Sequence, residues 1–313
     1  MRKLICLLLI VLFLPIPNLS AYAEQSSPKT EEPAEPKHPT ETPGPKTIVS
    51  EEESPFEEFI SPPYTCMFCK VYGQTLVQDT KHVLIFPTYY DHKRWLIFSG
   101  AVGSVLVLTA FDERIQEEIQ SHRNRVTDKA ASIINPFGFQ AAYGVIAGMY
   151  LHGVFAHNPK SKIVALDAIS SSLVSWGVVS TLFKIGIGRA RPSEGEGAFH
   201  FDPLTTNGEE NAFPSGHATQ AFALAAVLSS HYHSKWVVIP VYSFAGLVGL
   251  ARMNNNRHWT SDVVGGALIG TFIGRELVVY NRRKRRELAR KAEMSIAPIT
   301  DQRGRSLDLF IRF

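Results

Sequence analysis

The chain has few cysteines, little net charge and no strand-rich stretch before its tail. Its formal net charge is +3 over 313 residues, and no basic patch is interleaved with aromatic side chains, so we expect no nucleic-acid partner. Two of the three cysteines, Cys66 and Cys69, form one Cys-x2-Cys pair. A second ligand pair for zinc and a thioredoxin-like strand–helix context are both missing, so we expect these cysteines to form a structural disulfide in an oxidising compartment.

The two ends of the chain differ in composition from its middle. Residues 1–23 have a positively charged start, an apolar run and the triplet Ala21-Tyr22-Ala23, which is typical of a cleaved signal peptide; an uncleaved membrane anchor is the alternative. Residues 24–63 are rich in Pro, Glu, Ser, Thr and Lys, so we predict a disordered linker. Residues 64–286 are then the predicted folded domain, and residues 287–313 are a C-terminal tail.

The middle of the chain predicts an all-α fold. Its uncharged apolar stretches contain many Gly, Ser and Ala residues, which let helices pack closely. A charged, helix-favouring segment, Asp112–Lys129, separates the first two stretches. We expect a helical bundle of about six core helices, a basic surface at Arg282–Arg286, and then a short β-hairpin or strand over Ser306–Phe313, where apolar residues alternate. The apolar stretches are Trp95–Phe111, Phe137–Ala156, Ala168–Phe183, Ala218–Ser230, Trp236–Ala251 and Val263–Gly274.

Three short blocks gather basic residues and histidines beside these apolar stretches. Taken alone, each block is ordinary: a solvated helix end, a capped turn, or a His and an Asp on a helix surface. Their occurrence together indicates one shared anion site at an end of the bundle. The blocks are Lys184 to Arg191-Pro192, then Pro214-Ser215-Gly216-His217, then Arg252 through His258 to Asp262.

The first block has two cations that are suited to one phosphate group. Lys184 and Arg191 are two helical turns apart, so we predict that they share one face of a helix that Pro192 ends. Arg can hold two phosphate oxygens at once, while Lys acts as a point charge. Two such cations at one helix end are useful only if an anion binds there.

The second block predicts a helix start that faces the same anion. Ser215 is a plausible N-cap for a helix over Ala218–Ser229. Such a start would aim the N–H groups near Gly216 and His217 at the anion, with help from the helix dipole. Gly216 would also let the backbone approach the phosphate closely.

Together the blocks resemble the signature of the type 2 phosphatidic acid phosphatase superfamily, which includes bacterial acid phosphatases, lipid phosphate phosphatases, glucose-6-phosphatase and the vanadium-dependent haloperoxidases. Its pattern is Lys-x6-Arg-Pro, then Pro-Ser-Gly-His, then Ser-Arg-x5-His-x3-Asp. This chain departs at Ala251, where the family usually has Ser, which puts in doubt any hydrogen bond from that hydroxyl. The resemblance spans roughly residues 80–285 and implies that residues 64–286 are the catalytic domain.

The resemblance also implies a role for each residue. His258 would be the nucleophile that forms a phosphohistidine, and His217 would protonate the leaving alkoxide. Asp262 would accept a hydrogen bond from the other ring nitrogen of His258. No metal or other cofactor is implied, because Lys and Arg side chains supply the positive charge. The phosphate-binding residues would be Lys184, Arg191, Ser215, Gly216 and Arg252.

Three functions compete for this site. The first is a phosphatase that acts on a phosphate monoester or pyrophosphate, for which vanadate would be an inhibitor; the apolar helices favour a lipid-linked substrate. The second is a haloperoxidase with vanadate as cofactor on His258, although those enzymes are generally much longer. The third is a non-catalytic module that binds a phosphate headgroup, and the presence of both histidines and Asp262 argues against it.

Two features of the sequence give conflicting predictions of where the protein is located in the cell. Six membrane crossings with the basic run 282–286 inside would place the segment before Trp95 inside as well, whereas a signal peptide places it outside. We therefore expect an exported, compact helical domain in the periplasm that contacts a membrane surface. The alternative is a multi-pass inner-membrane enzyme.

Overall fold

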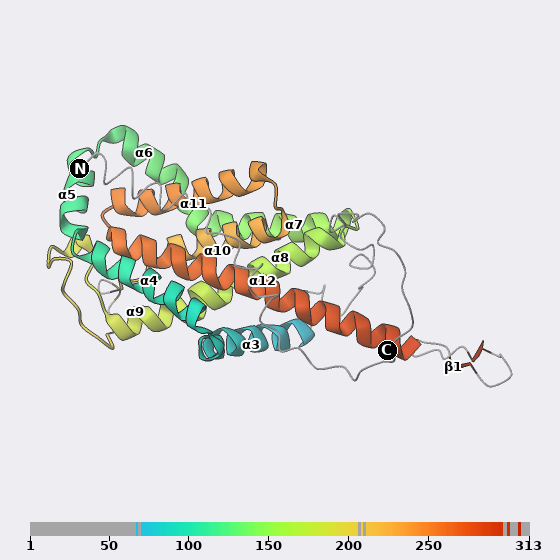
Figure 1. Ribbon diagram of the computed structural model, residues 1–313. Coiled ribbons are helices and arrows are strands. Elements are labelled where there is room, and N and C mark those ends of the chain that lie inside the picture. The colour runs from blue at the N-terminus through green and yellow to red at the C-terminus, as the bar shows by residue number, and fades with distance from the viewer. Residues whose placement is uncertain are drawn as a thin grey trace, which may run out of the picture.

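Long helices lie side by side in the structure, which is a computed structural model (Figure 1). The structure describes residue 67, residues 70–205, residue 208, residues 211–296, and the pieces 299–300 and 306–307. The predicted signal peptide, the linker and the Cys66–Cys69 pair lie outside the described residues. Those expectations therefore stay predictions.

The described helices reproduce the predicted apolar stretches. Together they make the fold all-α over this part of the chain. In chain order they are α3 Lys70–Ile85, η3 Phe86–Tyr89, α4 His92–Thr109, α5 Asp112–Ser121, α6 Arg125–Ile134, η4 Asn135–Gly138, α7 Gln140–Phe155, α8 Pro159–Ser172, η5 Leu173–Ser180, α9 Thr181–Ile187, η6 Pro192–Glu194, α10 Gly216–His231, α11 Lys235–Asn254 and α12 Thr260–Ile296.

The centre of the fold is the pair α10 and α12, whose backbones lie in contact. Three glycines of α12 face α10 in successive turns. A Cβ added at Gly266 would lie 2.6 Å from the Ser215 carbonyl oxygen, and one at Gly270 would lie 2.2 Å from that of Thr219. One at Gly274 would lie 2.8 Å from the Ala223 carbonyl oxygen. Since glycine has no Cβ, this stripe lets the two helices that carry the second and third blocks pack closely.

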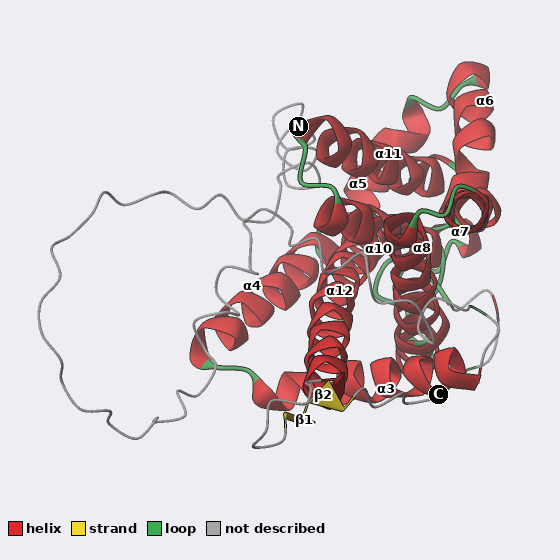
Figure 2. Cartoon of the chain, turned by 90° about the vertical axis from the view of Figure 1, so that its right-hand side faces the viewer, coloured by secondary structure: helices red, strands yellow, loops and turns green. Residues whose placement is uncertain are grey.

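The other helices surround this pair. α11 packs on α10, and α8 contacts both α10 and α12. α4 lies along α12 on the flank opposite α7 and α8 (Figure 2). The starts of α5, α10 and α12 and the loop after α9 lie at one end of the bundle (Figure 1), so the three blocks can meet there.

The charged segment Asp112–Lys129 is two helices rather than one. α5 ends at Ser121, and Asn124 begins α6 with a capping box. The Asn124 side chain accepts from the backbone N–H groups of Val126 and Thr127, and the Thr127 hydroxyl accepts from the Asn124 N–H. This cap turns the chain at the end of the bundle where the blocks lie.

Several helices are long and apolar enough to cross a membrane. Among the described residues these are Pro159–Ile187, Lys235–Asn254 and Thr260–Arg290, with a fourth if the bent pair α4 and α5 counts as one span. α4 has no buried residue, and its Leu96 side chain is 75% exposed. Bare apolar helix faces of this kind suit lipid rather than water. The structure thus favours the multi-pass alternative over the compact periplasmic domain that we expected. The part of the chain that it describes holds three or four candidate spans, whereas we had considered six.

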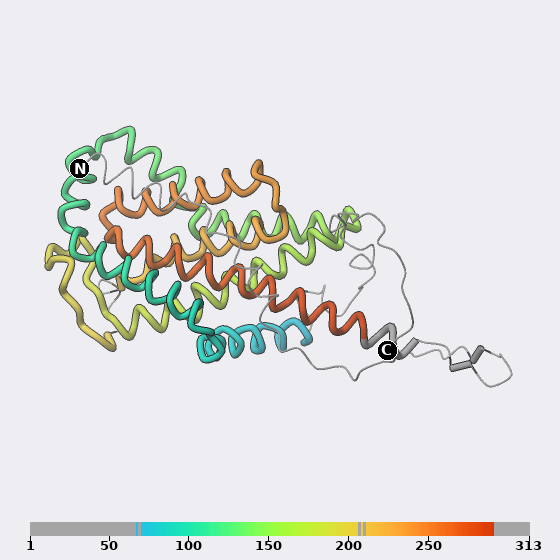
Figure 3. The backbone as a smooth tube through the Cα atoms, in the orientation of Figure 1, coloured from blue at the N-terminus to red at the C-terminus, as the bar shows by residue number. Residues whose placement is uncertain are grey.

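The C-terminal end differs from the prediction in two ways. α12 continues through Arg282–Arg286, as predicted (Figure 3). Its bounds, Thr260–Ile296, extend past the expected domain boundary at residue 286. Beyond it, β1 (Ile299–Thr300) and β2 (Ser306–Leu307) pair antiparallel over two residues each. Residues 308–313 lie outside the described part of the chain. This short pairing does not support a hairpin as an element of the fold.

Candidate active site

The first block is not one continuous helix. α9 ends at Ile187 because Gly188 adopts a left-handed conformation with φ 58°, in which a Cβ would lie 1.7 Å from the Asp202 carbonyl oxygen. Lys184 therefore lies on the helix, whereas Arg191 lies beyond it in extended backbone. The predicted shared helix face is wrong, since the glycine ends the helix before Pro192 does. The Lys184 ammonium group donates to the Asn211 carbonyl at 2.5 Å.

The second block lies at the start of α10, where the Ser215 side chain forms no hydrogen bond with the described residues. Ser215 occupies the N-cap, as predicted, but its side chain makes no capping hydrogen bond. Its hydroxyl is buried and has no hydrogen-bond partner among the described residues. The first N–H groups of any helix likewise lack an intrahelical partner. A Cβ on Gly216 would lie 2.9 Å from the Trp176 ring nitrogen and 3.9 Å from Lys184 Cε, so the first two blocks meet here.

The third block brings Arg252 to the same place. Arg252 lies in the last turn of α11, and one guanidinium nitrogen donates to the side-chain oxygen of Asn135 in η4 at 2.7 Å. Its buried Nε has no hydrogen-bond partner within the described ranges. His217 packs near η4 as well, because a Cβ on Gly138 would lie 2.6 Å from its ring. An anion at this point would satisfy donors that the protein leaves open.

His258 is buried, with one ring nitrogen held in place. Its Nδ1 lies 2.8 Å from the Ala212 carbonyl oxygen. A carbonyl can only accept, so Nδ1 carries the proton and Nε2 keeps its lone pair. The predicted hydrogen bond from His258 to Asp262 is not formed, since Nδ1 and Oδ2 are 3.9 Å apart. The carboxylate of Asp262 is engaged elsewhere: Oδ2 accepts from the Trp259 N–H at 2.8 Å, and Oδ1 accepts from Arg189 at 2.6 Å.

Basic groups from all three blocks lie close enough to lower the pKa of the two histidines. Burial lowers the pKa of His258 well below its usual value, and the positive charges of Lys184, Arg252 and Arg191 lower it further. Burial also lowers the pKa of His217 to about 3, with added repulsion from Arg252, His258 and Lys184. With only the protein's own groups around them, both imidazoles are therefore neutral at pH 7. The five basic groups act on one another, as expected of an anion site.

Sequence reasoning missed two charged residues beside this site, Arg189 and Asp112. Both are almost fully buried, and they are ion-paired with each other at 2.8 Å. Arg189 lies inside the first block, and Asp112 follows directly on an apolar stretch. The signal in the sequence was a charged residue, Asp112, directly after an apolar stretch. Its partner Arg189 lies 77 positions away, so only the fold reveals the pair.

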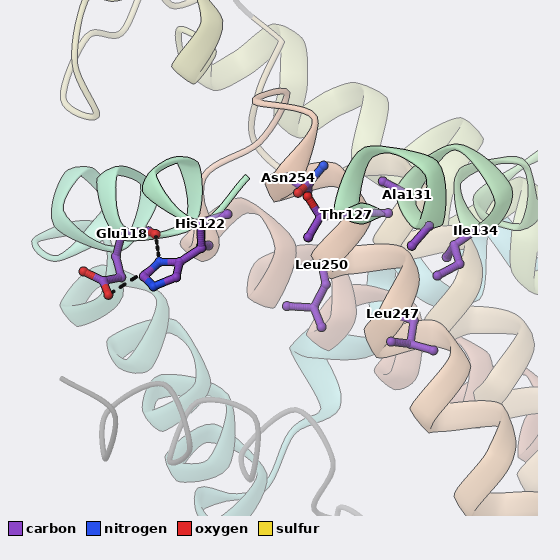
Figure 4. A pocket seen from close by; sticks show the side chains of 11 residues that line it. Glu118, His122, Thr127, Ala131, Ile134, Leu247, Leu250 and Asn254 are labelled. Atoms are coloured by element: carbon purple, nitrogen blue, oxygen red, sulfur yellow. Dashed lines mark hydrogen bonds and ion pairs between the residues drawn. The ribbon is translucent and has the colours of Figure 1, made fainter. Parts of the chain in front are cut away.

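A pocket of about 480 Å³ lies between α5, α6 and α11, and none of the predicted site residues lines it (Figure 4). Its wall is mostly apolar, with a polar rim. Ala251 and Ile134 belong to the wall, and each directly precedes in sequence a residue of the Arg252–Asn135 contact. Ala251, the position that departs from the expected Ser, therefore lies in this wall. The lining residues are Glu118, Ile119, His122, Thr127, Ala130, Ala131, Ile134, Leu247, Leu250, Ala251 and Asn254.

Comparisons with known proteins find relatives that match part of the chain. The chain is 35% identical over 103 residues to a lipid A 1-phosphatase of Porphyromonas gingivalis, a match that covers 32% of this chain and 23% of that protein. It is 32% identical over 118 residues to a lipid A 1-phosphatase of Rhizobium etli, covering 36% and 49%. The chain thus spans less than half the length of these relatives.

One solved structure and one family model also match this chain. The crystal structure of Aquifex aeolicus LpxE matches with a TM-score of 0.42 and 23% identity, covering 54% of this chain and 96% of that one. The PAP2 superfamily model matches residues 165–286, the part of the chain that holds all three blocks. This part of the chain is therefore similar to the PAP2 superfamily.

Proposed function

We propose that the protein is a phosphatase that removes a phosphate group from a lipid-linked phosphate monoester or pyrophosphate through a phosphohistidine. The observation that carries this proposal is the arrangement around His258. Its Nδ1 is committed to the Ala212 carbonyl, which leaves Nε2 as a nucleophile among three cations that act on the same ring. Such groups stabilise the charge that spreads over a transferring phosphoryl group.

The reaction proceeds in two displacements. His258 Nε2 attacks phosphorus, the bond to the leaving oxygen breaks, and His217 gives that oxygen a proton. Water then attacks the phosphohistidine and loses a proton to His217, which releases phosphate and restores both imidazoles. Lys184, Arg191 and Arg252 hold the phosphoryl oxygens throughout, and the hydroxyl of Ser215 donates to one of them.

His217 obtains its proton together with the substrate. The protein's own groups lower its pKa to about 3, by burial first and then by neighbouring positive charges. A bound phosphate group places negative charge among the same cations, so it offsets their repulsion and raises the pKa of His217. The ring is thus neutral until a substrate arrives and is protonated when the leaving group departs.

A lipid-linked substrate fits the surroundings of the site better than a soluble one. The site lies at the end of helices whose length and composition suit a membrane. Exposed apolar side chains on α4, such as Leu96 at 75% exposure, are also suited to contact with a bilayer that holds such a substrate. The two relatives compared above carry the name lipid A 1-phosphatase, which makes a phosphorylated glycolipid the first substrate to test.

A phosphate-release panel on the purified protein tests the proposal. Lipid A, phosphatidic acid, an isoprenyl pyrophosphate and a water-soluble aryl phosphate are compared with and without detergent. We expect turnover of at least one lipid substrate and its loss in His258→Ala. His152→Asn, a change on the exposed side of α7, is the matched control and should keep full activity. Full turnover by His258→Ala would end the phosphohistidine proposal, and turnover of the soluble ester alone would end the lipid assignment.

A further inference from the structure

One buried arginine beside the site uses all of its hydrogen-bonding capacity on protein groups. The guanidinium group of Arg189 is 2% exposed. It donates to Asp262 Oδ1 at 2.6 Å, to Asp112 Oδ2 at 2.8 Å and to the Ser261 hydroxyl at 2.7 Å. Two further bonds, at 2.9 and 2.8 Å, go to the Ala198 carbonyl. These five bonds account for the five N–H donors of a guanidinium group, so none remains for a substrate.

Asp112 completes this arrangement from the first residue of α5. Its Oδ1 accepts from the backbone N–H of Ser261 at 2.9 Å, and its Oδ2 accepts from the Ser261 hydroxyl as well as from Arg189. The side chain of Asp112 is fully buried. The start of α5 is thereby tied to the start of α12, where the third block lies.

Arg189 is connected to His258 indirectly, through two sets of hydrogen bonds. Through its side chain it holds Asp262, which accepts from the N–H of Trp259, the neighbour of His258. Through its backbone, the Arg189 carbonyl accepts from the Ala212 N–H at 2.9 Å, and the Ala212 carbonyl accepts from His258 Nδ1 at 2.8 Å. One residue therefore fixes both the peptide beside the histidine and the hydrogen-bond partner of its ring.

We propose that Asp112 and Arg189 are positioning residues that hold His258 in its attacking orientation, an inference that rests on the proposed function. They act on the nucleophile and leave phosphate binding to Lys184, Arg191 and Arg252. Loss of the Asp112 carboxylate frees Arg189 from α5 and loosens its hold on Asp262. The imidazole ring of His258 then remains nucleophilic, but it is no longer aligned with phosphorus.

Asp112→Asn tests this inference, because it keeps the size of the side chain and an acceptor for the Ser261 N–H. We expect kcat to fall by about 10- to 100-fold, as when the partner that orients a reactive histidine is weakened. The inhibition constant of inorganic phosphate should change by less than about threefold, because the clamp is untouched. Arg252→Ala should instead weaken phosphate inhibition strongly, which shows that the assay distinguishes the two roles.

Asp79→Asn is the matched control for the loss of a buried carboxylate. Asp79 is also fully buried, and it accepts from Ser170 and from Asn281. Asn281 lies 21 residues along α12 from Thr260, about 30 Å from the site at 1.5 Å per residue. Asp79→Asn should lower the melting temperature while kcat per folded molecule stays the same.

The outcomes separate the two proposals. If the wild-type protein releases no phosphate from any substrate, the proposed function fails. If the wild type is active and Asp112→Asn keeps its kcat, or loses kcat and phosphate affinity in the same proportion, the positioning role is refuted. If Asp112→Asn does not fold, Ser261→Ala decides by the same two measurements. That change removes only the hydroxyl that Asp112 and Arg189 share, and it should lower kcat by about 3- to 10-fold without weakening phosphate inhibition.

Discussion

Gly270→Ala should damage both the stability and the activity of this protein, although the glycine touches no site residue. Its Cβ would lie 2.2 Å from the Thr219 carbonyl oxygen and 2.8 Å from the Ala223 nitrogen. Both are backbone atoms, so no side chain can rotate away. Ordinary contacts begin at 3.4 Å, so α10 and α12 would have to separate by about 1.2 Å at this point, the difference between 3.4 and 2.2 Å.

The size of the effect follows from that displacement. Overpacking a core by one methyl group costs roughly 1–3 kcal/mol of folding free energy. α10 begins at the second block and α12 begins just after His258, so a shift between them changes the distance from the nucleophile to the helix start that faces phosphate. A misplacement of about 1 Å can cost around 100-fold in rate. We therefore expect a lower melting temperature and a kcat reduced by one to two orders of magnitude.

The assay compares Gly270→Ala with Gly148→Ala in one detergent. Gly148 lies on an exposed face of α7 with nothing within 4 Å of an added Cβ, so its replacement should stabilise the helix by about 0.5–1 kcal/mol. Thermal unfolding and phosphate release are measured for both. If Gly270→Ala melts at or above the wild-type temperature with full turnover, α10 and α12 do not pack as closely as the structure has them.

Four further outcomes follow from the geometry of the site. Arg252→Ala should lower kcat/KM by about 100- to 1,000-fold in the phosphate-release assay, because it removes a donor to the transferring group. Vanadate should inhibit as a mimic of the five-coordinate transition state, while EDTA should leave the rate unchanged; strong inhibition by EDTA would contradict the metal-free scheme. Binding of tungstate should take up a proton and tighten as the pH falls, since burial and neighbouring cations lower the pKa of His217 to about 3 and a bound anion raises it; calorimetry in two buffers measures this uptake, and its persistence in His217→Gln would assign the proton to another group. Gly188→Ala should destabilise the protein in thermal unfolding, because φ 58° and the contact with Asp202 both oppose a Cβ.

Much of the fold and site could be predicted from local pattern. The apolar stretches became helices because each is long, uncharged and free of strand signals. The three blocks were found by their spacing, and the N-cap position of Ser215 follows from the residues after it. The error over Lys184 and Arg191 came from Gly188: Pro192 was a visible helix stop, but the earlier glycine becomes a stop only where the returning chain at Asp202 leaves no room for a Cβ.

The contacts of His258 could not be predicted from spacing. A carboxylate four residues after a histidine is a plausible partner, and the sequence contains no sign that Arg189 would claim it. The actual partner is a backbone carbonyl, that of Ala212, and every residue except proline offers one donor and one acceptor of this kind. Ala212 is held beside Arg189, because its N–H donates to the Arg189 carbonyl at 2.9 Å. This contact between distant residues is a property of the tertiary structure.

The hydrogen-bond partners of the buried cations differ between a cation that stabilises the fold and the cations that we propose bind phosphate. Arg189 is neutralised by two carboxylates, those of Asp112 and Asp262, so its charge is already used within the protein. Lys184 and Arg252 are instead held by neutral oxygens, the Asn211 carbonyl and the Asn135 amide. A neutral acceptor fixes the position of a cation without cancelling its field, so the charge remains available to a bound phosphate. An Asn135→Asp variant tests this division, because it keeps the bond to Arg252 but supplies a competing negative charge. It should weaken phosphate inhibition and raise KM by at least tenfold while the protein folds normally, and an unchanged inhibition constant would mean that the neutrality of residue 135 is irrelevant to binding.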